Sequence, residues 1–166
     1  MARAPAPYLQ SPLWSGRLTE WSLVALVLLA LGFAFEREIR SLQAQSERVF
    51  VTSTVASMRT ALVLNRLARE LRPDDATLVV KNPFLLLQQV PTNFAGEVPM
   101  RNIYRVAPGS WVFDPECACV GYRLMYPEWL EPAQEVGAIW FQISKTGNNQ
   151  SLKPQANYVW LGTPVL

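Results

Sequence analysis

The sequence contains no histidine among its 166 residues, and it contains only two cysteines. Histidine is the commonest general base and a frequent zinc ligand, so its absence removes the usual catalytic triads and most zinc sites. No nucleophile-elbow motif and no glycine-rich phosphate loop are present either. We therefore expect neither an enzyme nor a cofactor-binding protein.

Charge is also sparse, since charged residues make up 17% of the chain and the net charge is +2. Nucleic-acid-binding domains commonly carry a strongly basic surface, which this composition does not supply. No acidic residue follows Glu135, so the late polar segment 145–154, with its lysines and amides, offers no carboxylate for a hard cation such as calcium. We expect no nucleic-acid partner and no metal site.

Residues 23–35 form a run of 13 residues without a polar side chain. A membrane-spanning helix usually needs about 20 mainly apolar residues, and a signal peptide has a shorter apolar run. No small-x-small cleavage site follows Phe35 directly, and no proline occurs between Leu18 and Arg72. These observations favour a retained membrane anchor over residues 18–35, with a removed signal peptide as the alternative.

The helix predicted for the anchor continues beyond it. Apolar residues recur at spacings of four, three and four, which is the period of an amphipathic helix. Pro73 disfavours helical geometry in the residue before it, so we expect the helix to end near Arg72. The apolar stripe is predicted to dock the helix on the rest of the protein, and it consists of Val51, Val55, Met58 and Leu62.

The pattern changes to short β-type runs from Pro73 onward. Asn82 followed by Pro83 is typical of the start of a short helix. The sequence therefore predicts an α+β fold, in which a long N-terminal α-helix packs on a small antiparallel β-sheet. The polar segment 145–154 is expected to be a loop, and the expected strands are residues 110–114, 120–125, 137–144 and 157–161.

The charges at the two ends of the anchor predict its orientation. The leader, residues 1–17, carries Arg3 and Arg17 and no acid, whereas acids and arginines balance just after Phe35. Basic residues favour the cytoplasmic side. We expect a cytoplasmic leader at 1–17, a transmembrane segment at 18–35, a periplasmic helical continuation at 36–72 and a small β-rich region at 73–166.

A glycine, a hydroxyl residue and a glutamate stand at the start of the apolar segment, at Gly16, Thr19 and Glu20. Together with the polar leader, the long unbroken helix and the small β region, they resemble the type IV pilins and type II secretion pseudopilins. The resemblance covers residues 16–72. It departs from the family pattern in two places: Arg17 replaces a large apolar residue, and Glu20 follows Gly16 by four positions where the family has five.

The resemblance implies a structural subunit of a type IV pilus or type II secretion system, of the minor or accessory type, in a bacterial inner membrane. It implies that a prepilin peptidase cuts between Gly16 and Arg17, and that Thr19 and Glu20 set the register between subunits. The implied partners are membrane lipid, other pilin-like subunits and inner-membrane assembly proteins. The alternative is a single-pass envelope protein that acts as an accessory subunit of a membrane complex without entering a filament.

Cys117 and Cys119 are separated by one residue in the connection between two predicted strands. A local disulfide is compatible with a turn, although an extended strand would place the two α-carbons near the upper limit for a disulfide. Two thiols without histidine make an incomplete zinc site. The sequence leaves open a local disulfide, two thiols without a role, and intermolecular or metal chemistry.

Overall fold

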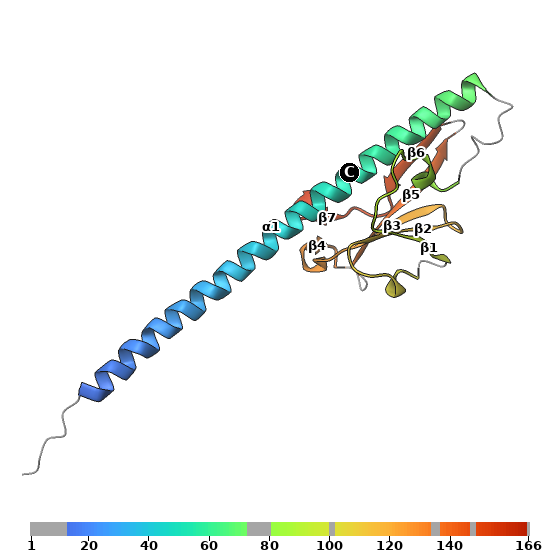
Figure 1. Ribbon diagram of the computed structural model, residues 1–166. Coiled ribbons are helices and arrows are strands. Elements are labelled where there is room, and N and C mark those ends of the chain that lie inside the picture. The colour runs from blue at the N-terminus through green and yellow to red at the C-terminus, as the bar shows by residue number, and fades with distance from the viewer. Residues whose placement is uncertain (1–12, 73–80, 100–101, 134–136, 147–148, 166) are drawn as a thin grey trace, which may run out of the picture. The chain divides into compact units, whose positions relative to one another are not determined.

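The computed structural model describes residues 13–72, 81–99, 102–133, 137–146 and 149–165, so most of the leader, 1–12, lies outside the described residues. The fold is α+β, as the sequence predicts. Helix α1 (Leu13–Leu71) begins a few residues before the expected start and ends within one residue of the expected end (Figure 1). The chain divides into two compact units, Met1–Ser41 and Leu42–Leu166.

The described residues of the second unit form two sheets and three short 3₁₀ helices. One sheet has five strands in the order β1-β2-β3-β5-β6, and the other has three in the order β4-β7-β8. The strands of the first sheet are β1 (Phe94–Glu97), β2 (Ser110–Asp114), β3 (Cys119–Arg123), β5 (Ala138–Thr146) and β6 (Asn149–Pro154). The remaining elements are β4 (Leu130–Glu131), β7 (Val159–Trp160), β8 (Thr163–Pro164), η2 (Pro83–Leu86), η4 (Ile103–Arg105) and η5 (Pro127–Trp129).

The expected short helix is present as η2. The Asn82 side chain caps it by accepting a hydrogen bond from the backbone N–H of Phe84 at 3.1 Å, and Pro83 occupies the first helical position. This arrangement satisfies a backbone donor that the first turn of a helix leaves free. Asn82, Pro83 and Phe84 are all buried, so the cap also anchors this segment on the core.

All four expected strands appear, with changed bounds, as β2, β3, β5 and β7, but the prediction of a loop at 145–154 is wrong for most of that segment. Residues 149–154 form β6, which pairs antiparallel with β5 from Phe141↔Pro154 to Thr146↔Asn149. The sequence of β6 is polar and does not show the apolar pattern of a strand, because Leu152 is its one buried apolar side chain. Two arginines of α1 reach this strand, Arg59 donating to the Leu152 carbonyl at 3.0 Å and Arg69 to Gln150 Oε1 at 3.2 Å.

The five-stranded sheet is antiparallel, as the sequence predicts, except for one parallel pair at its edge. β1 pairs parallel with β2, with a register shift between Phe94 and Glu97, whereas the other pairs are antiparallel. A short strand that pairs with a distant segment through a register shift leaves little trace in local sequence. β1 is therefore not among the strands that the sequence predicts.

The main core lies between the sheet and the part of α1 in the second unit, which runs beside the sheet in Figure 1. The four stripe residues are each at most 2% exposed and belong to this core, as predicted. Alternate residues of the central strands face it, because successive side chains of a strand point to opposite sides of the sheet. These strand residues are Trp111, Phe113, Val120, Tyr122, Ile139 and Phe141.

The other side of the sheet carries a smaller core of Ile103, Val106, Val112 and Ala138. Here Gly121 lies against the ring of Trp140 on the neighbouring strand. A β-carbon added at Gly121 would come within 2.7 Å of that ring. The glycine therefore makes room for the indole at this point of the sheet.

Candidate functional site

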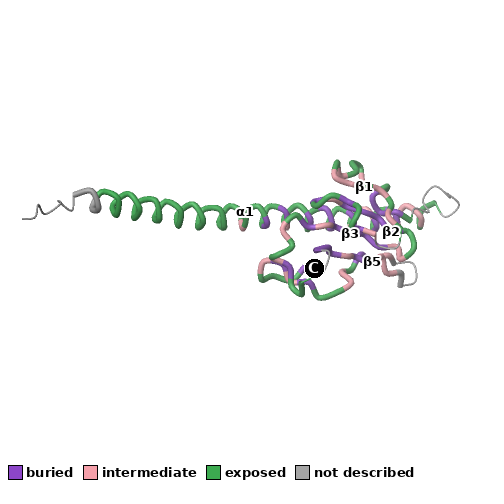
Figure 2. Tube along the Cα trace, turned by 90° about the horizontal axis from the view of Figure 1, so that it is seen from below, coloured by how far each residue is buried: buried purple, intermediate pink, exposed green. Residues whose placement is uncertain are grey.

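The apolar segment at residues 18–35 lies in the first unit. All of these residues are exposed within the structure, and Figure 2 shows this part of α1 in the colour of exposed residues. Leu28 is 62% exposed and Phe33 is 74% exposed. By length and composition, α1 contains a stretch of 18 residues that is apolar enough to cross a membrane, with a mean hydropathy of 2.0. None of that stretch is buried in the protein. The segment thus presents a fully uncovered apolar surface, compatible with a single membrane span.

The predicted processing and register residues lie together near the start of α1. Gly16, Arg17, Thr19 and Glu20 are all helical, and the last three are exposed. The Ser22 hydroxyl donates to the Thr19 carbonyl at 2.8 Å, a back-bond of the kind that hydroxyl residues make inside helices. Glu20 is the last acidic residue before the uninterrupted apolar run at 23–35.

A second apolar surface lies on the part of α1 in the second unit, away from the buried stripe. Leu42, Val49 and Val63 are 56%, 68% and 51% exposed and recur at multiples of seven residues. Because seven residues are close to two turns of helix, these side chains share one face. We call this surface, with Leu64 and Leu67, the outer face of α1.

A groove of about 740 Å³ opens beside the outer face. On α1 the groove is lined mostly by small side chains, together with Leu64 and Asn65, and Leu86 and Leu87 at the end of η2 also line it. Small residues let a second helix or strand approach the helix backbone closely. The small groove residues of α1 are Thr54, Ala56, Ser57, Thr60, Ala61 and Ala68.

Sequence reasoning missed a buried carboxylate on the inner side of α1. Glu47 is 8% exposed, and its Oε1 accepts hydrogen bonds from the Tyr122 hydroxyl at 3.0 Å and the Met125 backbone N–H at 2.7 Å. Its Oε2 is buried and has no hydrogen-bond partner among the described residues. The available signal was its position four residues before Val51, on the buried stripe.

Burial raises the pKa of the Glu47 carboxyl above its ordinary value of 4.5. Hydrogen bonds from Met125 and Tyr122 and the nearby backbone of Tyr126 oppose this shift, and the nearby Glu128 adds to it. Burial and the proximity of Glu47 also raise the pKa of Tyr122. The carboxyl thus ties α1 to the end of β3 while it resists ionisation.

We expect a pH dependence of stability that Glu47→Gln removes. As the pH rises from the ordinary glutamate pKa to the raised one, the unfolded chain loses this proton while the folded chain keeps it, so stability falls across that window. The free energy of unfolding of the variant minus that of the wild type should therefore increase with pH there. Denaturant titrations in detergent at several pH values measure it.

Glu38→Gln is the matched control, because Glu38 lies on the same helix and is exposed. Its difference from the wild type should stay constant over the same pH range. A constant difference for Glu47→Gln would contradict the assignment of Glu47 as a buried, reluctantly ionised group.

The two cysteines are joined by a disulfide, with 5.2 Å between their α-carbons. They lie at the end of the β2–β3 hairpin, where Ala118 adopts a positive φ of 52° and so permits the tight return of the chain. This bond is the local alternative among those that the sequence left open. It lies on the five-stranded sheet, on the opposite side of β3 from the core residues Val120 and Tyr122.

Among the described residues, no group of three or more histidine, cysteine or acidic side chains could hold a metal ion. The chain matches no protein-family model, no curated protein and no solved structure. The candidate functional features are therefore the apolar segment, the outer face of α1 with its groove, and the disulfide.

Proposed function

We propose that this chain is a pilin-like or pseudopilin-like structural subunit of a type IV pilus or a type II secretion system. It would reside in the bacterial inner membrane through residues 18–35, with its N-terminus cytoplasmic and its β-rich unit in the periplasm. Assembly would proceed through α1, with other pilin-like subunits as partners. Its role would be structural, without catalysis.

The observation that carries this proposal is the second apolar surface. A membrane anchor alone accounts for exposed apolar side chains at residues 18–35, but it does not account for Leu42, Val49 and Val63, which belong to the second unit. Exposed apolar patches of this kind mark interaction surfaces. A neighbouring α1 would cover the outer face, and the small residues of the groove would allow close contact.

Glu20 would set the register between subunits, with Thr19 beside it. A carboxylate at the edge of an apolar helix is costly unless it is paired or reaches water. In the pilin-like families, such a glutamate pairs with the N-terminal amine that processing frees on a neighbouring subunit. Cleavage after Gly16 would place that amine on Arg17, three residues from Glu20.

The first test is the intact mass and N-terminal sequence of the protein recovered from membranes of bacteria with and without a prepilin peptidase. We expect a chain that begins at Arg17 only when the peptidase is present. Gly16→Leu should block this processing, because the implied cut follows the glycine. Gly32→Leu, at the other glycine of α1, is the matched control and should be processed normally, because an added β-carbon there would have open space around it.

A chain that keeps its first 16 residues in both strains would overturn the pilin pathway. It would favour the alternative, a single-pass envelope protein that serves as an accessory subunit of a membrane complex. The alternative draws on Arg17 and on the four-residue spacing between Gly16 and Glu20, which depart from the family pattern. A soluble form that begins beyond Phe35 would overturn both, because the apolar segment would then be a removed signal peptide.

A further inference from the structure

The disulfide between Cys117 and Cys119 closes a very short loop, with a single residue between the two cysteines. A disulfide stabilises a fold chiefly by restricting the unfolded chain, and the restriction grows with the length of the loop that it closes. A loop this short restricts the unfolded chain very little. The bond therefore contributes little to the stability of the fold.

The hairpin is held by contacts that do not involve the disulfide. β2 and β3 are paired over five residues, from Ser110↔Arg123 to Asp114↔Cys119. In the turn, Asp114 Oδ1 accepts from the Glu116 backbone N–H at 2.9 Å, and the Ala118 carbonyl accepts from the Ile143 backbone N–H of β5 at 3.1 Å. Reduction of the disulfide would leave these contacts in place.

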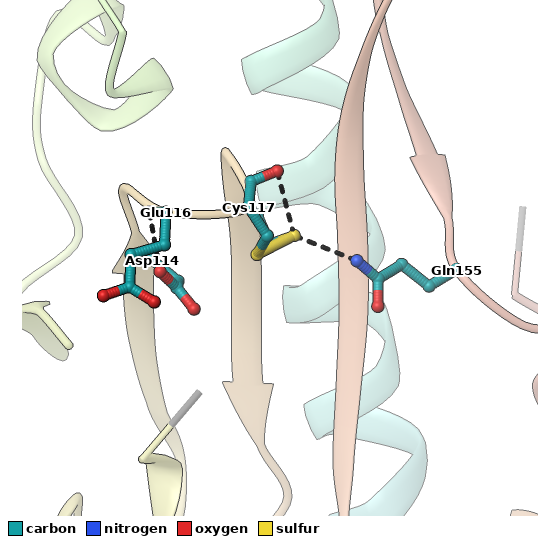
Figure 3. Close-up of a disulfide and its surroundings, with 5 residues drawn as sticks. Asp114, Glu116, Cys117 and Gln155 are labelled. Carbon is teal, nitrogen blue, oxygen red and sulfur yellow. Dashed lines mark hydrogen bonds between the residues drawn. A yellow bond between two sulfur atoms is a disulfide. The ribbon is translucent and has the colours of Figure 1, made fainter. Parts of the chain in front are cut away.

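The two sulfur atoms have unequal surroundings (Figure 3). Cys119 is completely buried, whereas Cys117 is partly exposed. The Gln155 side chain donates from Nε2 to Cys119 Sγ at 2.9 Å, and its own backbone is fixed by a bond to the Trp140 carbonyl at 2.9 Å. A donor held against one sulfur stabilises that sulfur when it becomes a thiolate.

We propose that Cys117 and Cys119 form a thiol–disulfide exchange site, at which an external thiol attacks Cys117 and Cys119 is the leaving group. The chemical class of substrate is a dithiol or, in the reverse direction, a disulfide. This proposal is independent of the proposed assembly function. It rests on the partly exposed Cys117, the buried Cys119 and the amide that Gln155 directs at the latter.

In the reaction, an external thiolate attacks Cys117 Sγ and forms a new S–S bond with it. The bond between the two protein sulfurs breaks, and its electron pair leaves with Cys119 Sγ, which takes a proton from water. The second thiol of the external dithiol then attacks the first sulfur of the same dithiol, which is bonded to Cys117 in the mixed disulfide, and Cys117 leaves as a thiol. One protein disulfide is reduced to two thiols while the external dithiol is oxidised to a disulfide.

Two single variants of the full chain in detergent test the difference between the sulfurs, with oxidised glutathione as the probe. Cys119→Ser leaves Cys117 as the one thiol, and we expect its mass to increase by one glutathione under native conditions. Cys117→Ser leaves the buried Cys119, and we expect no addition until denaturant is present. Equal reactivity of the two variants in the folded state, or no reaction of either, would overturn the proposal.

A measurement on the wild-type chain avoids any folding defect of these variants. The protein is exposed to reduced glutathione, quenched with acid and mapped by peptide mass. We expect the trapped mixed disulfide on Cys117, and we expect the fully reduced protein to keep its cooperative thermal transition. Glutathione on Cys119, or loss of that transition on reduction, would contradict the assignment.

The role of Gln155 has its own readout, which is the rate of reduction by dithiothreitol. Gln155→Leu removes the donor to Cys119 Sγ, and a hydrogen bond to a charged group is worth enough to slow the reaction by about tenfold. Gln142→Leu is the matched control, because Gln142 is exposed and pairs with Cys119 across the sheet. Equal rates in the two variants would remove Gln155 from the site.

Discussion

Replacing Leu28 by glutamate is expected to release the protein from membranes. Leu28 lies in the middle of the apolar segment and is 62% exposed within the structure, so nothing in the described part of the protein would shelter a charge there. On insertion scales, a charge at the centre of a spanning helix costs about 2.5 to 3.5 kcal/mol. The uninterrupted apolar run is short, so it has little reserve against such a loss.

The measurement is the fraction of protein that stays in the membrane pellet after alkaline extraction. Leu28→Ile keeps the apolar character at the same position and should be retained like the wild type. Thr60→Glu places the same charge on an exposed position of α1 in the second unit and should also be retained. Full retention of Leu28→Glu would mean that residues 18–35 are not the membrane anchor.

The second large effect is expected from Met58→Ala, which empties part of the contact between α1 and the sheet. Met58 is fully buried in the main core. Deleting a buried methionine side chain typically costs about 2 to 5 kcal/mol, because the cavity that remains is only partly filled by its neighbours. Denaturant unfolding of the full chain in detergent measures this cost. Tryptophan fluorescence reports it, since Trp111 and Trp160 are buried in the same core.

Leu64→Ala is the matched control for this variant. Leu64 is 60% exposed and lies on the outer face of α1, less than two turns beyond Met58. Exposed substitutions usually change stability by less than about 0.5 kcal/mol. If the outer face binds a neighbouring subunit, Leu64→Ala should weaken assembly while it leaves unfolding unchanged. A large loss of stability in Leu64→Ala would show that this side chain supports the fold.

Much of the fold could be predicted because its main signals are local. The spacing of Val51, Val55, Met58 and Leu62 indicates both the helix and the side of it that is buried. Pro73 indicates the end of the helix, and Asn82 with Pro83 indicates the start of η2. Each of these inferences depends on residues within a few positions of one another, where propensity and periodicity are informative.

The features that could not be predicted depend on distant partners. β6 is polar, and its pairing with β5 and the arginines of α1 bring it into the sheet. Glu47 is recognisable as unusual only when Tyr122 and Met125 are placed against it. In the same way, the spacing of the two cysteines suggests a bond, but the donor from Gln155 comes from a segment 36 residues away from Cys119.

Because Gly121 lies in close contact with the indole of Trp140, the substitutions that position 121 tolerates during evolution depend on the residue at position 140. While residue 140 remains tryptophan, every substitution at 121 adds atoms where the ring already lies, so selection should keep glycine there. The constraint is conditional, since a smaller residue at 140 would lift it. In descendants of this sequence, the two sites should therefore change in order, the tryptophan first and the glycine afterwards.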